Sequence, residues 1–192
     1  CKDGVFVCIS GAVVDGHSFI DEVISKGITS IVVEKDVTAP EGVTVIKVHS
    51  TRLALACMSA AYFDYPAEKL KTIGITGTKG KTTTSYMVKS ILEKTGFKTG
   101  LIGTIETIIG DTHIPAVNTT PESYVVQQSF RQMVDAGIEC VVMEVSSQGL
   151  MLHRVGGFTF DYGIFTNLEP DHIGPNEHKD FEEYLQCKGM LF

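Results

Sequence analysis

The segment TGTKGKTTT, residues 76–84, contains the residue types that bind phosphate groups. Backbone N–H groups in a glycine-rich turn can point at one anion, and the positive N-terminus of a following helix adds to the attraction. Lys81 can reach the β- and γ-phosphates of a nucleotide, and Thr82 can place its hydroxyl on Mg²⁺. The residues predicted to contact the nucleotide are Gly77, Thr78, Lys79, Gly80, Lys81, Thr82 and Thr83.

The glycine spacing departs from the general P-loop pattern, which places a glycine five residues before Gly80, where this chain has Ile75. A glycine- and threonine-rich turn with a surface lysine is the alternative interpretation. The context favours a nucleotide loop, because an apolar strand precedes the segment and a helical pattern follows it.

Glu144 ends the apolar segment CVVMEVS. An acid at the carboxyl end of a strand beside a phosphate loop is well placed to ligate Mg²⁺, whereas the alternative is an exposed glutamate at a sheet edge. We therefore predict that Glu144 and Thr82 contribute to a metal site.

Composition excludes several classes of function. The chain has 192 residues, of which 43% are hydrophobic, and a net charge of -7. The absence of a basic face argues against nucleic-acid binding, and no run of about 18 apolar residues predicts a membrane span. The five scattered cysteines are typical of reduced thiols in a cytoplasmic protein.

Alternation of strand and helix patterns predicts an α/β fold with mainly parallel sheets. We expect a small N-terminal domain over residues 1–70 and a P-loop-type parallel-sheet domain over 71–192, with the polar segment 64–71 as the linker. Ser50 and Thr120 are predicted to cap helices, and Pro121 to occupy the first position of the second one. The sequence begins inside an apparent strand and stops inside an apparent helix, so we expect a fragment.

Five segments resemble, in this order, the Mur ligase superfamily: TGTKGKTTT, NTTPES, MEVSSQGLMLHRV, FTNLEPDH and YLQCKGMLF. The resemblance is nearest to the MurE type, the UDP-N-acetylmuramoyl-tripeptide synthetases, and DGHSFI fits the UDP-binding domain of that type. It implies three domains: one for the UDP end of the substrate, a central ATPase and a C-terminal domain for the incoming amino acid. Here the first would be truncated at its start, the second cut short and the third absent.

The resemblance implies an ATP-dependent amide ligase of cytoplasmic peptidoglycan precursor synthesis. Its substrates would be UDP-MurNAc-L-Ala-D-Glu and an amino acid, either lysine or meso-diaminopimelate, joined through an acyl phosphate. ATP and Mg²⁺ would be the cofactors, and we expect a monomer that binds neither nucleic acid nor membrane.

The resemblance also implies roles for single residues. Lys81, His172 and a carbamylated Lys188 would be catalytic. The metal ligands would be Thr82, Glu144, His172 and Lys188. The contacts to the UDP-linked substrate would be Thr119, Thr120, Ser146 and Arg154. Asn118 is a further candidate on the nucleotide or metal side, and His17 is a weaker candidate for the UDP end.

Departures from the MurE pattern leave alternatives open. Gln148 stands where histidine is usual, Leu152 where glutamine is usual, and EPDHIGPNE replaces SRDHLDYHG. A divergent ligase on another acid, a folylpolyglutamate synthetase, a P-loop nucleotide-binding module without ligase activity and a catalytically silent fragment are the competing hypotheses. About 70 residues before the loop argue against the folate enzyme, which starts with its ATPase domain.

Overall fold

The computed structural model describes residues 4–11, 14–171, 173–174 and 177–192. The chain forms two compact units, Cys1–Leu55 and Ala56–Phe192, and helix α2 (Thr51–Tyr62) begins in the first and ends in the second. Across the described ranges, every helix is too short or too polar to cross a membrane.

The first unit is a three-stranded parallel sheet with a short helix. Strands β1 (Val5–Val7), β2 (Ser30–Val33) and β3 (Thr44–Lys47) follow one another in that order. The expected first helix consists of a 3₁₀ turn, η1 (Gly16–Phe19), and α1 (Ile20–Ser25). Its buried core contains Cys8, Ile20, Ile31 and Val33.

His17 connects η1 to the end of β2. Its Nε2 accepts a hydrogen bond from the backbone N–H of Glu34 at 3.1 Å, so its Nδ1 carries the proton and donates to Asp15 Oδ1 at 2.7 Å. Both ring nitrogens are therefore engaged within this unit. A role of His17 toward a UDP group stays a prediction.

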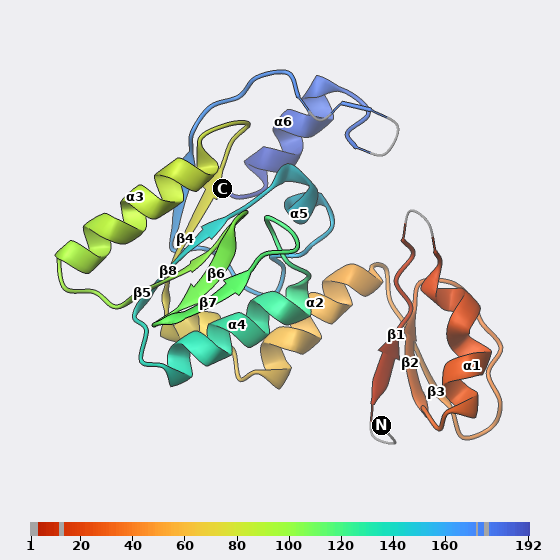
Figure 1. The fold of residues 1–192 in the computed structure, drawn as a ribbon. Coiled ribbons are helices and arrows are strands. Elements are labelled where there is room, and N and C mark those ends of the chain that lie inside the picture. The colour runs from red at the N-terminus through yellow and green to blue at the C-terminus, as the bar shows by residue number, and fades with distance from the viewer. Residues whose placement is uncertain (1–3, 12–13, 172, 175–176) are drawn as a thin grey trace. The chain divides into compact units, whose positions relative to one another are not determined.

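The second unit contains a six-stranded sheet in the order β7-β6-β5-β8-β4-β9 (Figure 1). The strands are β4 (Lys71–Thr76), β5 (Thr99–Ile102), β6 (Glu106–Ile109), β7 (Thr112–Pro115), β8 (Cys140–Glu144) and β9 (Tyr162–Phe165). The four strands β5-β8-β4-β9 are parallel, which confirms the predicted α/β fold. The antiparallel pair β6–β7 is an edge hairpin that the sequence patterns did not reveal.

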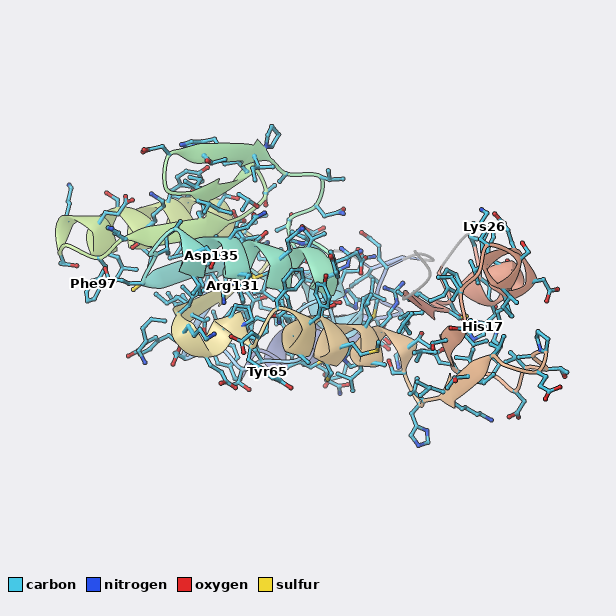
Figure 2. All side chains as sticks on the ribbon, turned by 90° about the horizontal axis from the view of Figure 1, so that it is seen from below. His17, Lys26, Tyr65, Phe97, Arg131 and Asp135 are labelled. Carbon is cyan, nitrogen blue, oxygen red and sulfur yellow. The ribbon has the colours of Figure 1, made fainter. Side chains whose placement is uncertain are left out.

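Helices cover both faces of this sheet. α3 (Lys81–Lys94) packs on one face over Ile73, Leu101 and Val142, and α4 (Ser123–Asp135) packs on the other, where Phe130 is buried. Every residue of β8 is buried, as expected for a strand covered on both faces. The exposed side of α4 carries an ion pair between Arg131 and Asp135 (Figure 2).

Helix α4 begins further along the chain than predicted. α4 begins at Ser123 with Glu122 as its N-cap, so the predicted cap at Thr120 and first helical position at Pro121 are wrong. The Thr120 hydroxyl instead accepts from the Ser146 N–H at 2.9 Å. Within the expected linker, η2 (Pro66–Lys69) packs against α4, and the domain boundary near residue 70 stays a prediction.

We expect Phe130→Ala to lower the free energy of unfolding by about 3–5 kcal/mol, because it removes a fully buried ring and leaves a cavity. The Phe130 ring also makes an edge contact with Phe158 at 5.1 Å between centroids. Urea denaturation of the full chain measures the change. The matched control is Val125→Ala on the exposed side of α4, which should cost less than about 1 kcal/mol. Equal losses in the two variants would contradict the placement of Phe130.

Candidate active site

The loop between β4 and α3 turns at two glycines. Gly77 has φ +142° and Gly80, the residue before α3, has φ +81°. Both values lie in the region that favours glycine. A Cβ on Gly77 would lie 2.0 Å from Thr166 Oγ1, so the loop packs against the chain that follows β9 with no room for a side chain. Gly77 and Gly80 thus supply the backbone freedom that this turn needs. The turn forms although Ile75 stands where the general P-loop pattern has a glycine.

Hydrogen bonds from the segment after β9 hold both the side chains and the backbone of the loop. The Thr78 hydroxyl accepts from the Glu169 N–H at 3.0 Å, and the Lys79 N–H donates to Asn167 Oδ1 at 3.0 Å. Lys79 itself is exposed and pairs with the Glu169 carboxylate, whereas Thr83 is exposed on α3. The loop residues therefore divide into inward ones, such as Thr78, and solvent-facing ones, such as Lys79.

Two lysine side chains reach the same carbonyl. Lys81 Nζ and Lys188 Nζ each lie 2.9 Å from the Gly77 carbonyl oxygen, and Lys81 also donates to Thr78 O at 3.1 Å. Lys188, on α6 (Phe181–Gly189), is only 1% exposed and lies 4.5 Å from the centre of the Tyr184 ring. These two predicted site residues are 107 positions apart in the sequence, and the structure brings their amines to the same carbonyl oxygen.

Burial lowers the pKa of both amines. It lowers the pKa of Lys81, against the opposing effect of Glu144 and Asp171. For Lys188, burial and then the positive charge of Lys81 lower the pKa to about 8. The pKa of Lys188 therefore lies much closer to physiological pH than the ordinary value for a lysine.

Glu144 is completely buried at the end of β8. Its Oε2 accepts from the Thr82 hydroxyl at 2.8 Å and from the Thr104 hydroxyl at 3.0 Å, and its Oε1 accepts from the Thr104 N–H at 3.1 Å. A Cβ on Gly103 would lie 2.4 Å from Oε1, so that position has no room for a side chain. Two of the four predicted metal ligands, Thr82 and Glu144, are therefore adjacent.

The predicted substrate residues surround one cavity of about 200 Å³. Its lining includes Lys81, Asn118, Thr119, Thr120, Ser146, Ser147, Gln148, Arg154, Glu177 and His178. Ser146 caps α5 (Ser147–Met151) by accepting from the Gly149 N–H at 3.0 Å. Arg154 donates to Thr120 O at 3.0 Å and pairs with Glu122 at 2.8 Å.

Thr104 and His178 are among the residues of this region that the sequence analysis did not predict. Thr104 bonds to Glu144, and its place just after β5 at the carboxyl edge of the sheet could have indicated it. His178 is 1% exposed, lines the cavity and has its Nε2 2.8 Å from Ser147 Oγ. His172 lies outside the described residues, and the neighbouring Asp171 is exposed.

A parallel sheet, a glycine-rich loop at its carboxyl edge and a helix after that loop define a P-loop-type α/β domain. The model of the Mur ligase middle domain matches residues 75–192, and that of the Mur ligase family catalytic domain matches residues 2–63. The chain belongs to the Mur ligase family.

The names of individual relatives specify one reaction within the Mur ligase family. The chain is 56% identical to the UDP-N-acetylmuramoyl-L-alanyl-D-glutamate--2,6-diaminopimelate ligase of Clostridium perfringens, over 97% of this chain and 38% of that protein. It is 51% identical to ligase 1 of the same name from Clostridium acetobutylicum, over 100% of this chain and 39% of that protein. The chain thus spans less than two fifths of the length of these relatives.

Solved structures share the fold. A UDP-N-acetylmuramoyl-L-alanyl-D-glutamate--2,6-diaminopimelate ligase has a TM-score of 0.81 at 21% identity, over 97% of this chain and 37% of that one. The MurF ligase from Thermotoga maritima in complex with ADP has a TM-score of 0.56 at 22% identity, over 97% of this chain and 39% of that one.

We expect Thr82→Val to lower the free energy of unfolding by about 1–3 kcal/mol, because it removes one hydrogen bond from the buried Glu144 carboxylate. Thr83→Val is the matched control, since it makes the same substitution at the next, exposed position of α3. Thermal and urea denaturation of both variants measure the difference. If both variants lose the same stability, Thr82 does not support Glu144.

Proposed function

We propose that this chain is part of an ATP-dependent ligase that joins 2,6-diaminopimelate to UDP-N-acetylmuramoyl-L-alanyl-D-glutamate in peptidoglycan precursor synthesis. The relatives named for this reaction support the choice of diaminopimelate over lysine. The observation that carries the proposal is the convergence of Lys81, Lys188 and the buried Glu144 around the Gly77–Thr82 loop. Such an enzyme acts in the cytoplasm on soluble precursors, and we infer a monomer.

The loop fits the phosphates of ATP. Gly77 and Gly80 permit the turned backbone of the loop, in which the Thr78 and Lys79 N–H groups donate to Asn167. The attraction for an anion comes from the N-terminus of α3, which follows Gly80 and carries a partial positive charge. Lys81 Nζ now donates to two loop carbonyls and can exchange these bonds for phosphate oxygens. The nucleotide contacts are assigned to Gly77, Thr78, Lys79, Gly80, Lys81, Thr82 and Thr83.

Glu144 and Thr82 fit a Mg²⁺ ion that is bound together with the phosphates of a nucleotide. Described residues form no group of three or more His, Cys, Asp or Glu that could hold a metal ion. Mg²⁺ in such enzymes is held by one or two carboxylates, a hydroxyl, waters and the phosphates, for which Glu144 and Thr82 provide oxygen atoms. When bound, Mg²⁺ neutralises charge on the transferred phosphoryl group.

Lys188 can become a ligand only after its charge is removed. A neutral lysine amine adds to CO₂, forming an N–C bond and releasing one proton, and the resulting carbamate has two oxygen atoms. Burial of Lys188 beside Gly77 supports this step, because a buried amine is poorly solvated as a cation. We propose that the carbamate of Lys188, together with Glu144, Thr82 and His172, serves a metal site.

The cavity beside the loop suits the acid substrate. We assign contacts with the UDP-linked substrate to Thr119, Thr120, Ser146 and Arg154, all of which line it. Arg154 lines the cavity, and a guanidinium there suits a carboxylate or a phosphate. Lys81 lines the same cavity and can stabilise both the attacking carboxylate and the phosphate that it approaches.

The reaction proceeds in two steps. The substrate carboxylate attacks the γ-phosphorus of ATP, which breaks the bond to the β-phosphate oxygen and yields an acyl phosphate and ADP. The amine of diaminopimelate then attacks the acyl carbon, and phosphate leaves as the amide forms. Bringing a carboxylate to a triphosphate requires fixed positive charge, which Lys81 supplies.

We expect the full-length enzyme to release phosphate only when ATP, UDP-MurNAc-L-Ala-D-Glu and diaminopimelate are all present. Lys81→Ala should reduce this turnover at least about 100-fold, because a fixed cation at the transferred group is lost. Lys94→Ala, at the exposed end of the same helix, is the control and should retain normal turnover. Phosphate release that ignores the UDP-linked substrate would contradict the ligase assignment.

Carbamylation has a readout that does not depend on activity. In ¹³CO₂-enriched buffer, the full-length protein should show a carbamate carbon resonance that is lost in Lys188→Ala and retained in Lys179→Ala, which removes an exposed lysine just before α6. Short carboxylates should partly restore ligation to Lys188→Ala by replacing the carbamate. Full activity of Lys188→Ala without any additive would sink the metal-bridging role.

A further inference from the structure

Thr104 lies between two groups of the proposed ligase site. It follows β5 and Gly103 at the carboxyl edge of the sheet. Its hydroxyl oxygen lies 3.0 Å from Glu144 Oε2 and 3.1 Å from the hydroxyl oxygen of Thr119. Glu144 is assigned to the metal, and Thr119 is assigned to the UDP-linked substrate. One side chain therefore contacts residues of both assignments.

The hydrogen of the Thr104 hydroxyl is directed to the carboxylate. A hydroxyl has one hydrogen to donate, and an ionised carboxylate only accepts hydrogen bonds. Thr104 therefore donates to Glu144 Oε2, and its oxygen accepts the hydrogen of the Thr119 hydroxyl. Because the Thr119 hydrogen is used in this contact, the Thr119 oxygen offers only its lone pairs to a ligand.

The backbone of Thr104 holds the same carboxylate. Its N–H donates to Glu144 Oε1 at 3.1 Å, so the backbone and the side chain of one residue contact both carboxylate oxygens. A Cβ at Gly103 would lie 2.4 Å from Oε1, and glycine there permits this close approach. Thr82 also donates to Oε2, but it is itself assigned to the metal. Thr104 thus orients the carboxylate without belonging to the proposed ligand set.

The neighbouring Thr120 hydroxyl also directs its hydrogen into the protein. Both acceptors of that hydrogen, Glu144 O at 3.1 Å and Ser146 Oγ at 3.2 Å, are protein atoms. The cavity has strong donors elsewhere in its lining, the cations Lys81 and Arg154. Anionic groups of a substrate fit these cations, whereas an N–H or O–H group fits the Thr119 oxygen.

We propose that Thr104 is a positioning residue that couples the Glu144 carboxylate to the substrate cavity and makes Thr119 a hydrogen-bond acceptor for an amide N–H or a hydroxyl of the UDP-linked substrate. The peptide part of that substrate has amide N–H groups, and its sugars have hydroxyls. The inference rests on the proposed function, because it requires this substrate in the cavity.

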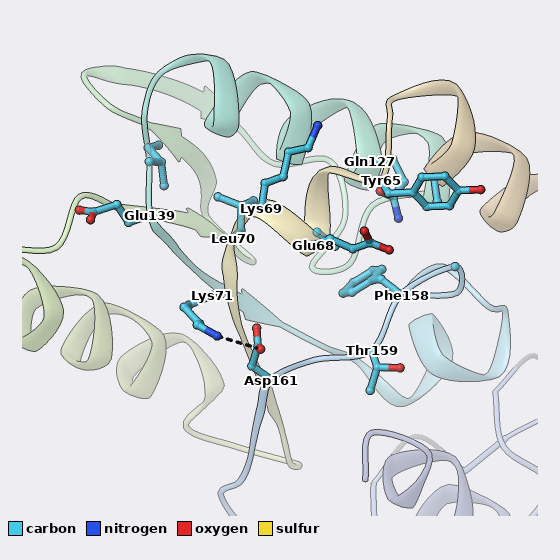
Figure 3. A pocket seen from close by; sticks show the side chains of 14 residues that line it. Tyr65, Glu68, Lys69, Leu70, Lys71, Gln127, Glu139, Phe158, Thr159 and Asp161 are labelled. Atoms are coloured by element: carbon cyan, nitrogen blue, oxygen red, sulfur yellow. Dashed lines mark hydrogen bonds and ion pairs between the residues drawn. The ribbon is translucent and has the colours of Figure 1, made fainter.

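A similar pair at the opposite end of the sheet provides a matched control. Thr72 donates through its N–H and its hydroxyl to Asp161 Oδ2, at 2.8 and 3.1 Å. Asp161 also pairs with Lys71, and together with Gln127 it lines a separate cavity of about 660 Å³ (Figure 3). Thr72 and Thr104 thus make the same kind of contact with a carboxylate, and of the two only Thr104 bonds to a residue that lines the substrate cavity.

The test measures binding of UDP-MurNAc-L-Ala-D-Glu to the full-length enzyme by calorimetry, without ATP or Mg²⁺. Thr104→Val should weaken binding at least about fivefold, because Thr119 loses the partner that fixes its hydroxyl. Thr104→Ser keeps a hydroxyl and should bind within about twofold of the wild type. Thr72→Val should lower Tm, as Thr104→Val does, but should leave the affinity unchanged.

A double-mutant cycle tests the link between the two hydroxyls. Thr119→Val alone should weaken binding at least about fivefold, because the acceptor is lost. The double variant Thr104→Val/Thr119→Val should bind no more than about twofold more weakly than Thr119→Val, because Thr104 acts on the substrate through Thr119. Independent effects would instead multiply to about 25-fold, and that result would contradict the coupling.

Neutron diffraction of the wild-type enzyme shows the direction of both hydrogen bonds, and it decides the question if a variant does not fold. The deuterium on Thr104 Oγ1 should point to Glu144, and the one on Thr119 should point to Thr104.

The opposite direction would overturn the proposal. Normal affinity of Thr104→Val, or equal losses of affinity in Thr72→Val and Thr104→Val, would also overturn it. These results leave the proposed function intact as long as the wild type binds UDP-MurNAc-L-Ala-D-Glu. A wild-type enzyme that does not bind this substrate would contradict the proposed function and this inference with it.

Discussion

The burial of the Glu144 carboxylate is the constraint on which the carboxyl edge of the sheet depends. A carboxylate without solvent must receive hydrogen bonds, and here they come from Thr82 on α3 and from Thr104 after β5. The start of α3 and the end of β5 are therefore tied to the end of β8. Gly103 completes the arrangement, since any side chain there would occupy the space of the carboxylate.

A second group of contacts determines the shape of the phosphate loop. Gly77 packs against Thr166, and its carbonyl accepts from both Lys81 and Lys188. The loop conformation consequently requires β9 and α6, which follow it by more than 80 residues. Lys188 is coupled to Lys81 through this carbonyl, and the mutual repulsion of two cations helps to lower the pKa of Lys188.

The two edges of the parallel sheet have different properties for a physical reason. At the carboxyl edge, the loops after β4, β5 and β8 leave hydroxyls, amines and N–H groups directed toward one region. At the opposite edge, the chain enters the strands through η2 and the segments before β8 and β9, and their packing leaves the cavity at Gln127. The two ends of the same strands therefore carry different side chains: a buried carboxylate with hydroxyl donors at one, and a partly charged cavity at the other.

The sequence by itself determined the α/β class, the glycine-rich turn between a strand and a helix, and the family, because these depend on local periodicity and on short motifs. It also placed Lys81, Thr82 and Glu144 correctly relative to their strands and helices, since residues at the carboxyl ends of parallel strands share one edge. The tertiary structure decided the rest. It directed the Thr120 hydroxyl to Ser146 instead of a helix cap, and it buried Gln127 without a partner. Such outcomes arise from contacts between distant segments, which local sequence patterns do not encode.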